Sequence, residues 1–143
     1  NIGEIKLFKN GSWFPVKDLG SFDQDGYYFH HGRADDVIIS AGWTMSAVEI
    51  EDVLLKHTAV EEAAVIGVPD EERGRIVKAF IITKSNEKTS LVKELQAFTR
   101  ERLSLHEYPR LIEFTDTLPK TPAGKVNRKI LRESTTEDNK RDI

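Results

Sequence analysis

Two predominantly apolar segments constrain the fold of this chain more than any other feature of its sequence. The first runs from Ala63 to Val68 and ends at Pro69-Asp70, and the second runs from Val77 to Thr83 and is interrupted by Lys78. Short apolar runs that end at turn residues are typical of strands that are buried on both faces of a sheet. We therefore predict that both segments are buried strands and that they neighbour each other in one sheet.

Helical patterns on both sides of these strands predict an α+β domain, with a small sheet of about three strands flanked by helices. Ser46 precedes Glu49 at the spacing of a capping box, which marks a helix start. The apolar residues of this helix lie on one helical face: Ala47, Ile50, Val53 and Leu54. A second helix is predicted from near Thr89 or Ser90, with the buried stripe Leu91, Leu95 and Phe98. A third strand is expected at Arg110 to Thr115, and a short basic helix at Asn127 to Glu133.

The first part of the chain has a different pattern, which predicts β-hairpin strands from the end of a larger domain. Strand candidates are Ile5 to Phe8, Trp13 to Val16, and Tyr27 to Phe29 after a Gln24-Asp25-Gly26 turn. So short a set of hairpins cannot bury a core of its own. We expect residues 1–34 to end a large domain, residues 35–133 to form a second domain, and residues 134–143 to be a polar tail. The start at Asn1, without an initiator methionine, favours a fragment.

Composition excludes several classes of function. The net charge of −3 argues against a protein that mainly binds nucleic acid, because phosphate neutralisation needs an excess of basic residues. The absence of cysteine excludes disulfides and thiolate sites. No apolar run is long enough for a membrane span and no export signal is present, so we expect a cytoplasmic protein. The histidines lack the spacing of metal ligands, so no metal site is expected.

Charge is distributed unevenly along the sequence. Basic residues gather near the end of the chain: Lys120, Lys125, Arg128, Lys129 and Arg132. Acidic residues gather in the middle: Glu49, Glu51, Asp52, Glu61 and Glu62. Such clusters are consistent either with a solvated surface or with a basic patch for a phosphorylated ligand, and the sequence leaves both interpretations open.

Four segments in order resemble the adenylate-forming, or AMP-binding, superfamily, and in particular the C-terminal domain of its acetyl, medium-chain and aryl acyl-CoA synthetases. They are GRADDVIISAG (Gly32 to Gly42), VEIEDVLLKH (Val48 to His57), AAVIGVPDEERGRIVKAFI (Ala63 to Ile81) and LPKTPAGKVNRKILR (Leu118 to Arg132). The resemblance implies an acid–thiol ligase. Such an enzyme converts a carboxylic acid, ATP and CoA to acyl-CoA, AMP and diphosphate through an acyl-adenylate.

The resemblance also implies roles for individual residues. Lys125 matches the catalytic lysine of adenylation, which lies between the carboxylate and the α-phosphate. Arg33 matches a residue that contacts the nucleotide ribose, and Asp35 matches the hinge about which the small domain rotates. Asp18 matches the aspartate that accepts hydrogen bonds from the ribose hydroxyls. An exposed surface lysine is the alternative for Lys125, and an exposed loop aspartate is the alternative for Asp18. For Arg33 and Asp35 the alternative is a surface ion pair between them.

Coenzyme A contacts are implied at three further positions. Gly42 matches a glycine that lines the pantetheine channel, although it can also be a turn glycine. Arg100 occupies a position at which relatives place a basic side chain against the coenzyme phosphates, and Arg102 is its helical neighbour. Both arginines would equally suit the negative end of the helix dipole. Thr44 departs from the family pattern because it cannot supply the usual polar or basic group near the nucleotide phosphates.

The resemblance leaves several functions open. ATP or AMP and CoA are the expected ligands, and Mg²⁺ is expected mainly on a missing N-terminal domain, which is also the expected partner. Because the phosphate loop and the acyl pocket lie outside this sequence, we predict that the isolated chain makes no acyl-adenylate, and the small carboxylic acid is not identified. One alternative is an adenylation domain that loads a carrier protein. Another is a non-catalytic module that retains only the fold.

Overall fold

The computed structural model describes residues 17–141 of the chain, with the side chains of Leu19, Ser21, His31, Gly32, Asp35 and residues 137–141 left aside. The predicted strands Ile5 to Phe8 and Trp13 to Val16 lie outside the described residues. The chain forms two compact units that divide between Val37 and Ile38. Within residues 17–141, no helix has both the length and the hydropathy needed to cross a membrane.

The first unit contains a hairpin whose second strand overlaps the predicted strand Tyr27 to Phe29, whereas its first strand was not predicted. Strands β1 (Asp18–Phe22) and β2 (Tyr28–Arg33) are antiparallel, and the register shifts between Leu19 and Gly20. Asp23 closes the turn, because its Oδ1 accepts hydrogen bonds from the backbone N–H groups of Asp25 and Tyr27, each at 2.9 Å. A single 3₁₀ turn, η1 (Ala34–Asp36), follows β2.

The second unit is built on a three-stranded sheet with the order β5-β6-β7. Strands β5 (Glu62–Asp70) and β6 (Gly74–Ile82) are antiparallel, while β7 (Leu111–Phe114) is parallel to β6. These are the two buried strands and the third strand that the sequence predicted, and the α+β class is confirmed. Residues alternate along β5, so that Ala63 and Val65 join one buried cluster while Ala64, Ile66 and Val68 join another. The sheet is therefore buried on both faces.

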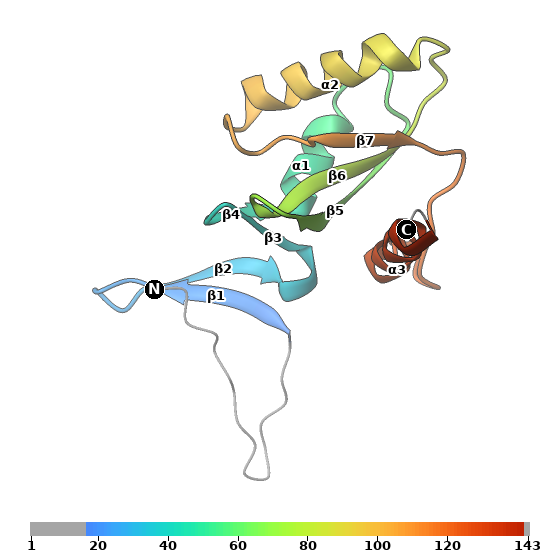
Figure 1. The fold of residues 1–143 in the computed structure, drawn as a ribbon. Coiled ribbons are helices and arrows are strands. Elements are labelled where there is room, and N and C mark those ends of the chain that lie inside the picture. The colour runs from blue at the N-terminus through green and yellow to red at the C-terminus, as the bar shows by residue number, and fades with distance from the viewer. Residues whose placement is uncertain (1–16, 142–143) are drawn as a thin grey trace. The chain divides into compact units, whose positions relative to one another are not determined.

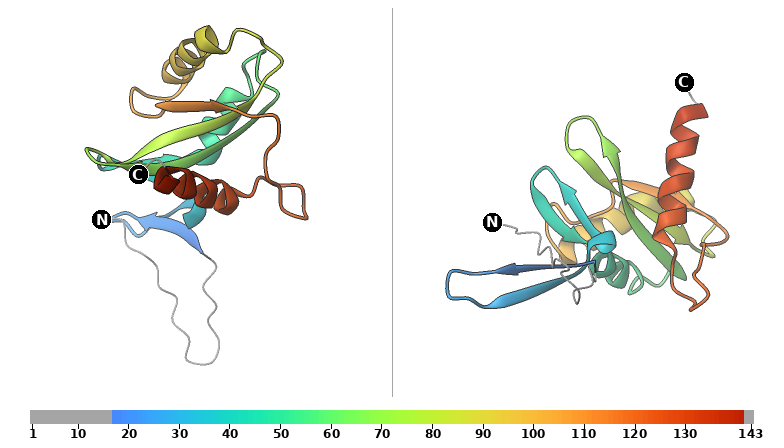
Figure 2. Two further views of the ribbon diagram at one scale, coloured as in Figure 1. Left: turned by 45° about the vertical axis from the view of Figure 1, so that its right-hand side comes forward. Right: turned by 90° about the horizontal axis from the view of Figure 1, so that it is seen from below.

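Helices cover the two faces of this sheet (Figures 1 and 2). Helices α1 (Ala47–Leu54) and α2 (Lys88–Arg102) pack on one face, where Ile50, Leu54, Leu91 and Leu95 are buried together. Helix α3 (Arg128–Arg141) contributes Leu131 to the cluster on the opposite face. The predicted cap of α1 is confirmed, since Ser46 Oγ accepts a hydrogen bond from Glu49 N at 3.3 Å.

Two helices differ in detail from their predictions. In α2, Phe98 is only half-buried, and Thr99 takes the third buried position because it lies four residues after Leu95. The Thr99 hydroxyl donates to the Leu95 carbonyl at 2.7 Å, which satisfies it inside the core. Helix α3 was expected to end near Glu133, but it continues to Arg141. The stretch after Glu133 contains neither glycine nor proline, so nothing in it breaks the helix.

The sequence did not predict the short hairpin of β3 (Val37–Ser40) and β4 (Trp43–Ser46), which leads into α1. Its turn residues both have positive φ, 48° at Ala41 and 83° at Gly42. Two left-handed residues in succession form the tight turn that suits the twist of paired strands. Ala41 is strained there, because a Cβ disfavours this backbone conformation.

Replacing Ala41 by asparagine is expected to raise the free energy of unfolding by about 1 kcal/mol, because asparagine tolerates the left-handed conformation better than alanine does. Gly42→Ala is the matched control and is expected to lower the free energy of unfolding by about 1 kcal/mol or more. Urea-induced unfolding of the chain, followed by circular dichroism, measures both changes. A loss of stability in Ala41→Asn would contradict this account of the turn.

Candidate functional site

Lys125 lies on a narrow loop between β7 and α3, and hydrogen bonds join the two arms of this loop. Thr121 N donates to the Lys125 carbonyl at 2.7 Å, and Lys125 N donates to Thr121 Oγ1 at 3.3 Å. Lys120 pairs with Val126 in an isolated antiparallel bridge. Gly124 has a φ of 80°, which a residue with a side chain rarely adopts. The hydrogen bonds and the glycine turn therefore hold the backbone of Lys125 in one conformation.

The Lys125 side chain is exposed, and its ammonium group forms no ion pair with any residue in the described part of the chain. Other members of the basic cluster do have acidic partners. Lys120 Nζ lies 2.7 Å from Glu62 Oε2, and Lys129 Nζ lies 3.8 Å from Glu133 Oε1. The acidic middle segment thus neutralises part of the basic cluster. A uniform basic patch does not form, and Lys125 is left available for a ligand.

Arg128, three residues after Lys125, makes the shortest of these ion pairs. Its Nη2 is 2.6 Å from Glu51 Oε2 and its Nε is 3.2 Å from Glu51 Oε1, with side-chain exposures of 15% for Arg128 and 11% for Glu51. The sequence analysis treated both residues only as members of charge clusters. The missed signal is the position of Glu51, which shares with Ala47, Ile50 and Leu54 the helical spacing of the buried face.

Asp18 and Arg33, the two nucleotide candidates, are brought together by the hairpin of the first unit. They are directly opposite each other in the register of β1 and β2. Asp18 Oδ2 lies 3.6 Å from His30 Nε2, and both Asp18 and Arg33 are exposed. The expected alternative, an Arg33–Asp35 ion pair, involves a side chain outside the described set. One end of the hairpin thus carries a carboxylate and a guanidinium group at paired positions of its two strands.

Asp35, the predicted hinge, lies within the 3₁₀ turn Ala34–Asp36. The division between the two compact units falls after Val37, close in sequence to Asp35 and to the predicted domain boundary. Asp18 and Arg33 belong to the first unit, whereas Lys125 belongs to the second. The location of a hinge at Asp35 remains a prediction.

Gly42 occupies the tip of the β3–β4 hairpin. A Cβ added there would meet none of the described atoms within 4 Å, so its φ of 83° accounts for the glycine. The next residue, Trp43, is 56% exposed and stacks on His106 with 4.6 Å between ring centroids and 18° between ring planes. Thr44 is exposed on β4. A channel beside Gly42 would need walls from elsewhere, and its contact with coenzyme A remains a prediction.

Arg100 and Arg102, both in the last turn of α2, have different surroundings. Arg102 Nη1 donates to the Phe98 carbonyl at 3.2 Å, and its guanidinium carbon lies 3.5 Å from the centre of the Phe98 ring. These contacts fit compensation of the helix dipole. The Arg100 guanidinium lies 5.1 Å from the ring of Tyr108, and Arg110 lies at the same distance from that ring. The sequence analysis missed Tyr108 and Arg110 as neighbours of Arg100.

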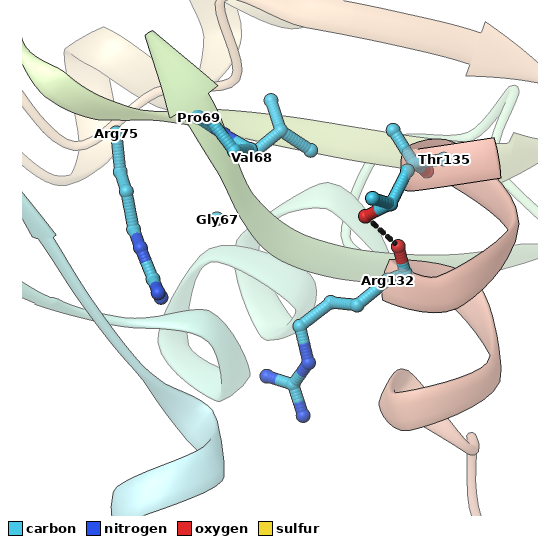
Figure 3. A pocket seen from close by; sticks show the side chains of 7 residues that line it. Gly67, Val68, Pro69, Arg75, Arg132 and Thr135 are labelled. Atoms are coloured by element: carbon cyan, nitrogen blue, oxygen red, sulfur yellow. Dashed lines mark hydrogen bonds between the residues drawn. The ribbon is translucent and has the colours of Figure 1, made fainter. Parts of the chain in front are cut away.

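A cavity of about 170 Å³ lies where the ends of β5 and β6 meet α3. Its lining residues are Gly67, Val68, Pro69, Arg75, Arg132, Thr135 and Thr136. Gly67 and Arg75 both line it (Figure 3), and a Cβ added at Gly67 would lie 3.0 Å from Ile38 Cγ2, which is a tight contact. None of the predicted site residues lines this cavity.

No group of three or more His, Asp or Glu side chains among the described residues has the arrangement of a metal site.

Comparison with known proteins gives a consistent set of similarities. A family model, the AMP-binding enzyme C-terminal domain, matches residues 49–125 and so ends on Lys125. An uncharacterized acyl-CoA ligase of Bacillus subtilis is 43% identical over 90% of the chain and 25% of its own length. A mitochondrial acyl-coenzyme A synthetase of Homo sapiens is 42% identical over 86% of the chain and 22% of its own length. The crystal structure of a Brucella canis acyl-CoA synthetase has 45% identity and a TM-score of 0.71, over 87% of this chain and 23% of that one. The chain thus spans about a quarter of the length of these relatives.

Proposed function

This chain belongs to the AMP-binding enzyme C-terminal domain family, and from that premise we propose that it is the C-terminal part of an AMP-forming acyl-CoA synthetase. The names of the relatives support this assignment, because an acyl-CoA ligase and two acyl-CoA synthetases match most of the chain at 42% to 45% identity. The proposed partner is the N-terminal domain of the same enzyme. It would carry the acyl pocket, the phosphate loop and the Mg²⁺ that accompanies ATP.

The proposed reaction has two steps. A carboxylate oxygen of the substrate attacks the α-phosphorus of ATP, and the bond to the β-phosphate breaks, so that acyl-adenylate forms and diphosphate leaves. The sulfur of CoA then attacks the acyl carbon, AMP leaves with the bonding electron pair, and the thiol loses its proton. This balance of atoms needs no redox partner.

The single observation that carries the proposal is the exposed ammonium group of Lys125 on a tightly bonded loop. In the first step two anions must approach each other, and a cation between them lowers their repulsion and stabilises charge on the phosphoryl oxygens. The long lysine stem allows this charge to enter a site that is built mainly by another domain. A lysine already neutralised by a carboxylate of its own domain would serve this purpose poorly.

The other predicted residues take supporting roles in the proposal. Asp18 and Arg33 contact the nucleotide ribose, which their opposed positions on β1 and β2 allow. Rotation about Asp35 removes Lys125 after adenylation and brings Gly42 and Arg100 toward CoA. Arg102 is assigned to the same CoA surface, although its contacts with Phe98 favour a structural part for it.

The proposal is tested by giving the complete enzyme a panel of short, medium-chain and aromatic acids. Acid-dependent exchange between ATP and labelled diphosphate is expected, followed by thioester formation when CoA is added. A phosphopantetheinyl carrier protein offered in place of CoA tests the alternative acceptor. Thioester on the carrier but not on CoA would make the enzyme a carrier-loading adenylation enzyme.

The chain of 143 residues by itself is expected to catalyse no acid-dependent exchange of diphosphate into ATP, because Lys125 alone provides neither the phosphate loop nor the acyl pocket. The same assay measures this, with the complete enzyme as the positive control. Exchange by the isolated chain would show that it holds a complete adenylation site. The assignment of the phosphate loop and the acyl pocket to another domain would then be wrong.

A further inference from the structure

A buried ion pair between Arg128 and Glu51 is one of the contacts that connect the Lys125 loop to the rest of its domain. Arg128, three residues after Lys125, is the first residue of α3, and Glu51 is on α1. The guanidinium group meets the carboxylate through two nitrogens, at 2.6 and 3.2 Å. Two parallel contacts between planar groups determine orientation as well as distance.

The Glu51 carboxylate is itself held by the sheet. Its Oε1 also accepts a hydrogen bond from the backbone N–H of Val65, in the middle of β5, at 2.7 Å. Helix α1, strand β5 and the start of α3 therefore meet at one side chain. A shift of the loop would break contacts of a carboxylate that is only 11% exposed, and a buried charge without partners is costly.

The other attachments of the loop are less directional. Leu118 before the loop and Leu131 after it are buried in one apolar cluster. Apolar packing is non-directional, so it determines the orientation of the loop less well than hydrogen bonds do. Lys120 and Glu62 form an ion pair with both side chains more than 40% exposed, and such pairs restrain a loop weakly. Of the loop attachments named here, the contact between Glu51 and Arg128 is the one that is both buried and bidentate.

We infer that Glu51 and Arg128 are positioning residues for adenylation, which hold the Lys125 loop at the angle that the reaction needs. This inference rests on the proposed function of Lys125. Neither residue touches the substrate in this proposal; each acts through the lysine. A misplacement of a reacting group by about 1 Å can lower a rate by about 100-fold, so a loosened loop would be seen in the rate of adenylation. Thioester formation from acyl-adenylate does not use Lys125 and should be nearly unaffected.

The test compares the two half-reactions in the complete enzyme. Arg128→Lys keeps the positive charge but loses the bidentate geometry, and Glu51→Gln keeps an acceptor for Val65 N. Each is expected to lower kcat for acid-dependent exchange of diphosphate into ATP by about 10- to 100-fold. Thioester formation from supplied acyl-adenylate should stay within about threefold of the parent enzyme. Glu62→Gln, which removes the exposed ion pair of the same loop, is the matched control and should stay within about twofold in both assays.

The outcomes separate the inference from the function on which it rests. If Lys125→Ala leaves adenylation unchanged, the proposed function fails. If Lys125→Ala stops adenylation while Arg128→Lys and Glu51→Gln leave it unchanged, or lower both half-reactions equally, only the positioning role is wrong. A variant that has lost thioester formation altogether is unfolded, and the decision then rests on the other of the two variants.

Discussion

Replacing Lys125 by alanine in the complete enzyme is expected to reduce acid-dependent exchange of diphosphate into ATP by about 100- to 1000-fold, as the removal of one transition-state donor does elsewhere. The side chain is exposed and forms no ion pair with the described residues, so its removal leaves no buried group without a partner. The structural cost of the substitution should be small. The loss of rate therefore reports on the positive charge that is missing from the reaction.

Two measurements make this result specific. Thioester formation from supplied acyl-adenylate should remain within about threefold, because in the proposed mechanism the domain rotates before the second step and removes Lys125. Lys129→Ala is the matched control: it removes another exposed lysine, four residues away, whose partner is Glu133 on its own helix. It should leave both half-reactions nearly unchanged. Normal adenylation by Lys125→Ala would instead favour a non-catalytic module that has kept the fold.

Replacing Leu95 by alanine is expected to lower the free energy of unfolding by about 2 to 5 kcal/mol. Leu95 is 0% exposed and belongs to the cluster in which α1 and α2 meet the sheet. The substitution removes apolar contacts and leaves a cavity that its neighbours fill only in part. Because native domains are stable by only about 5 to 15 kcal/mol, this single change would unfold a substantial fraction of the molecules on mild heating.

The control for this prediction is the same substitution at an exposed leucine. Leu105, in the segment after α2, is 67% exposed, and Leu105→Ala should change the free energy of unfolding by less than about 0.5 kcal/mol. Urea-induced unfolding of the chain, followed by circular dichroism, compares the two variants under one set of conditions. Equal stability of Leu95→Ala and the parent chain would contradict the assignment of the α2 core.

Local patterns were sufficient to predict most elements of the fold. Ala63 to Val68 and Val77 to Thr83 lie in the paired strands β5 and β6, because predominantly apolar runs are typical of a sheet covered on both faces. Ser46 and Glu49 marked the start of α1, because their capping contact lies within one helical turn. The hairpin of β3 and β4 was missed, because Ala41 in the turn is not a residue that signals positive φ.

The candidate site was predictable only in part. Lys125 was singled out by the resemblance, and its loop is made by contacts over a few positions. The cluster of Arg100 and Arg110 around Tyr108 was missed, because it joins the end of α2 to the loop before β7. The role of Asp35 as a hinge rests on the resemblance and remains a prediction. The same holds for the ligand contacts of the other candidates: Asp18, Arg33, Gly42, Arg100, Arg102 and Lys125.

The sequence by itself determined the alternation of strands and helices, the residues of the core and the position of the lysine loop, because each depends on periodicity or on neighbours along the chain. Only the tertiary structure decided which charges are neutralised. Glu51 and Arg128 are 77 positions apart. The helical spacing of Glu51 places it on the buried face of α1, but nothing in the sequence shows that its partner is Arg128. Folding brings them together out of water and leaves Lys125 exposed to it, since burial and pairing of charges depend on distances in space rather than on distances along the chain.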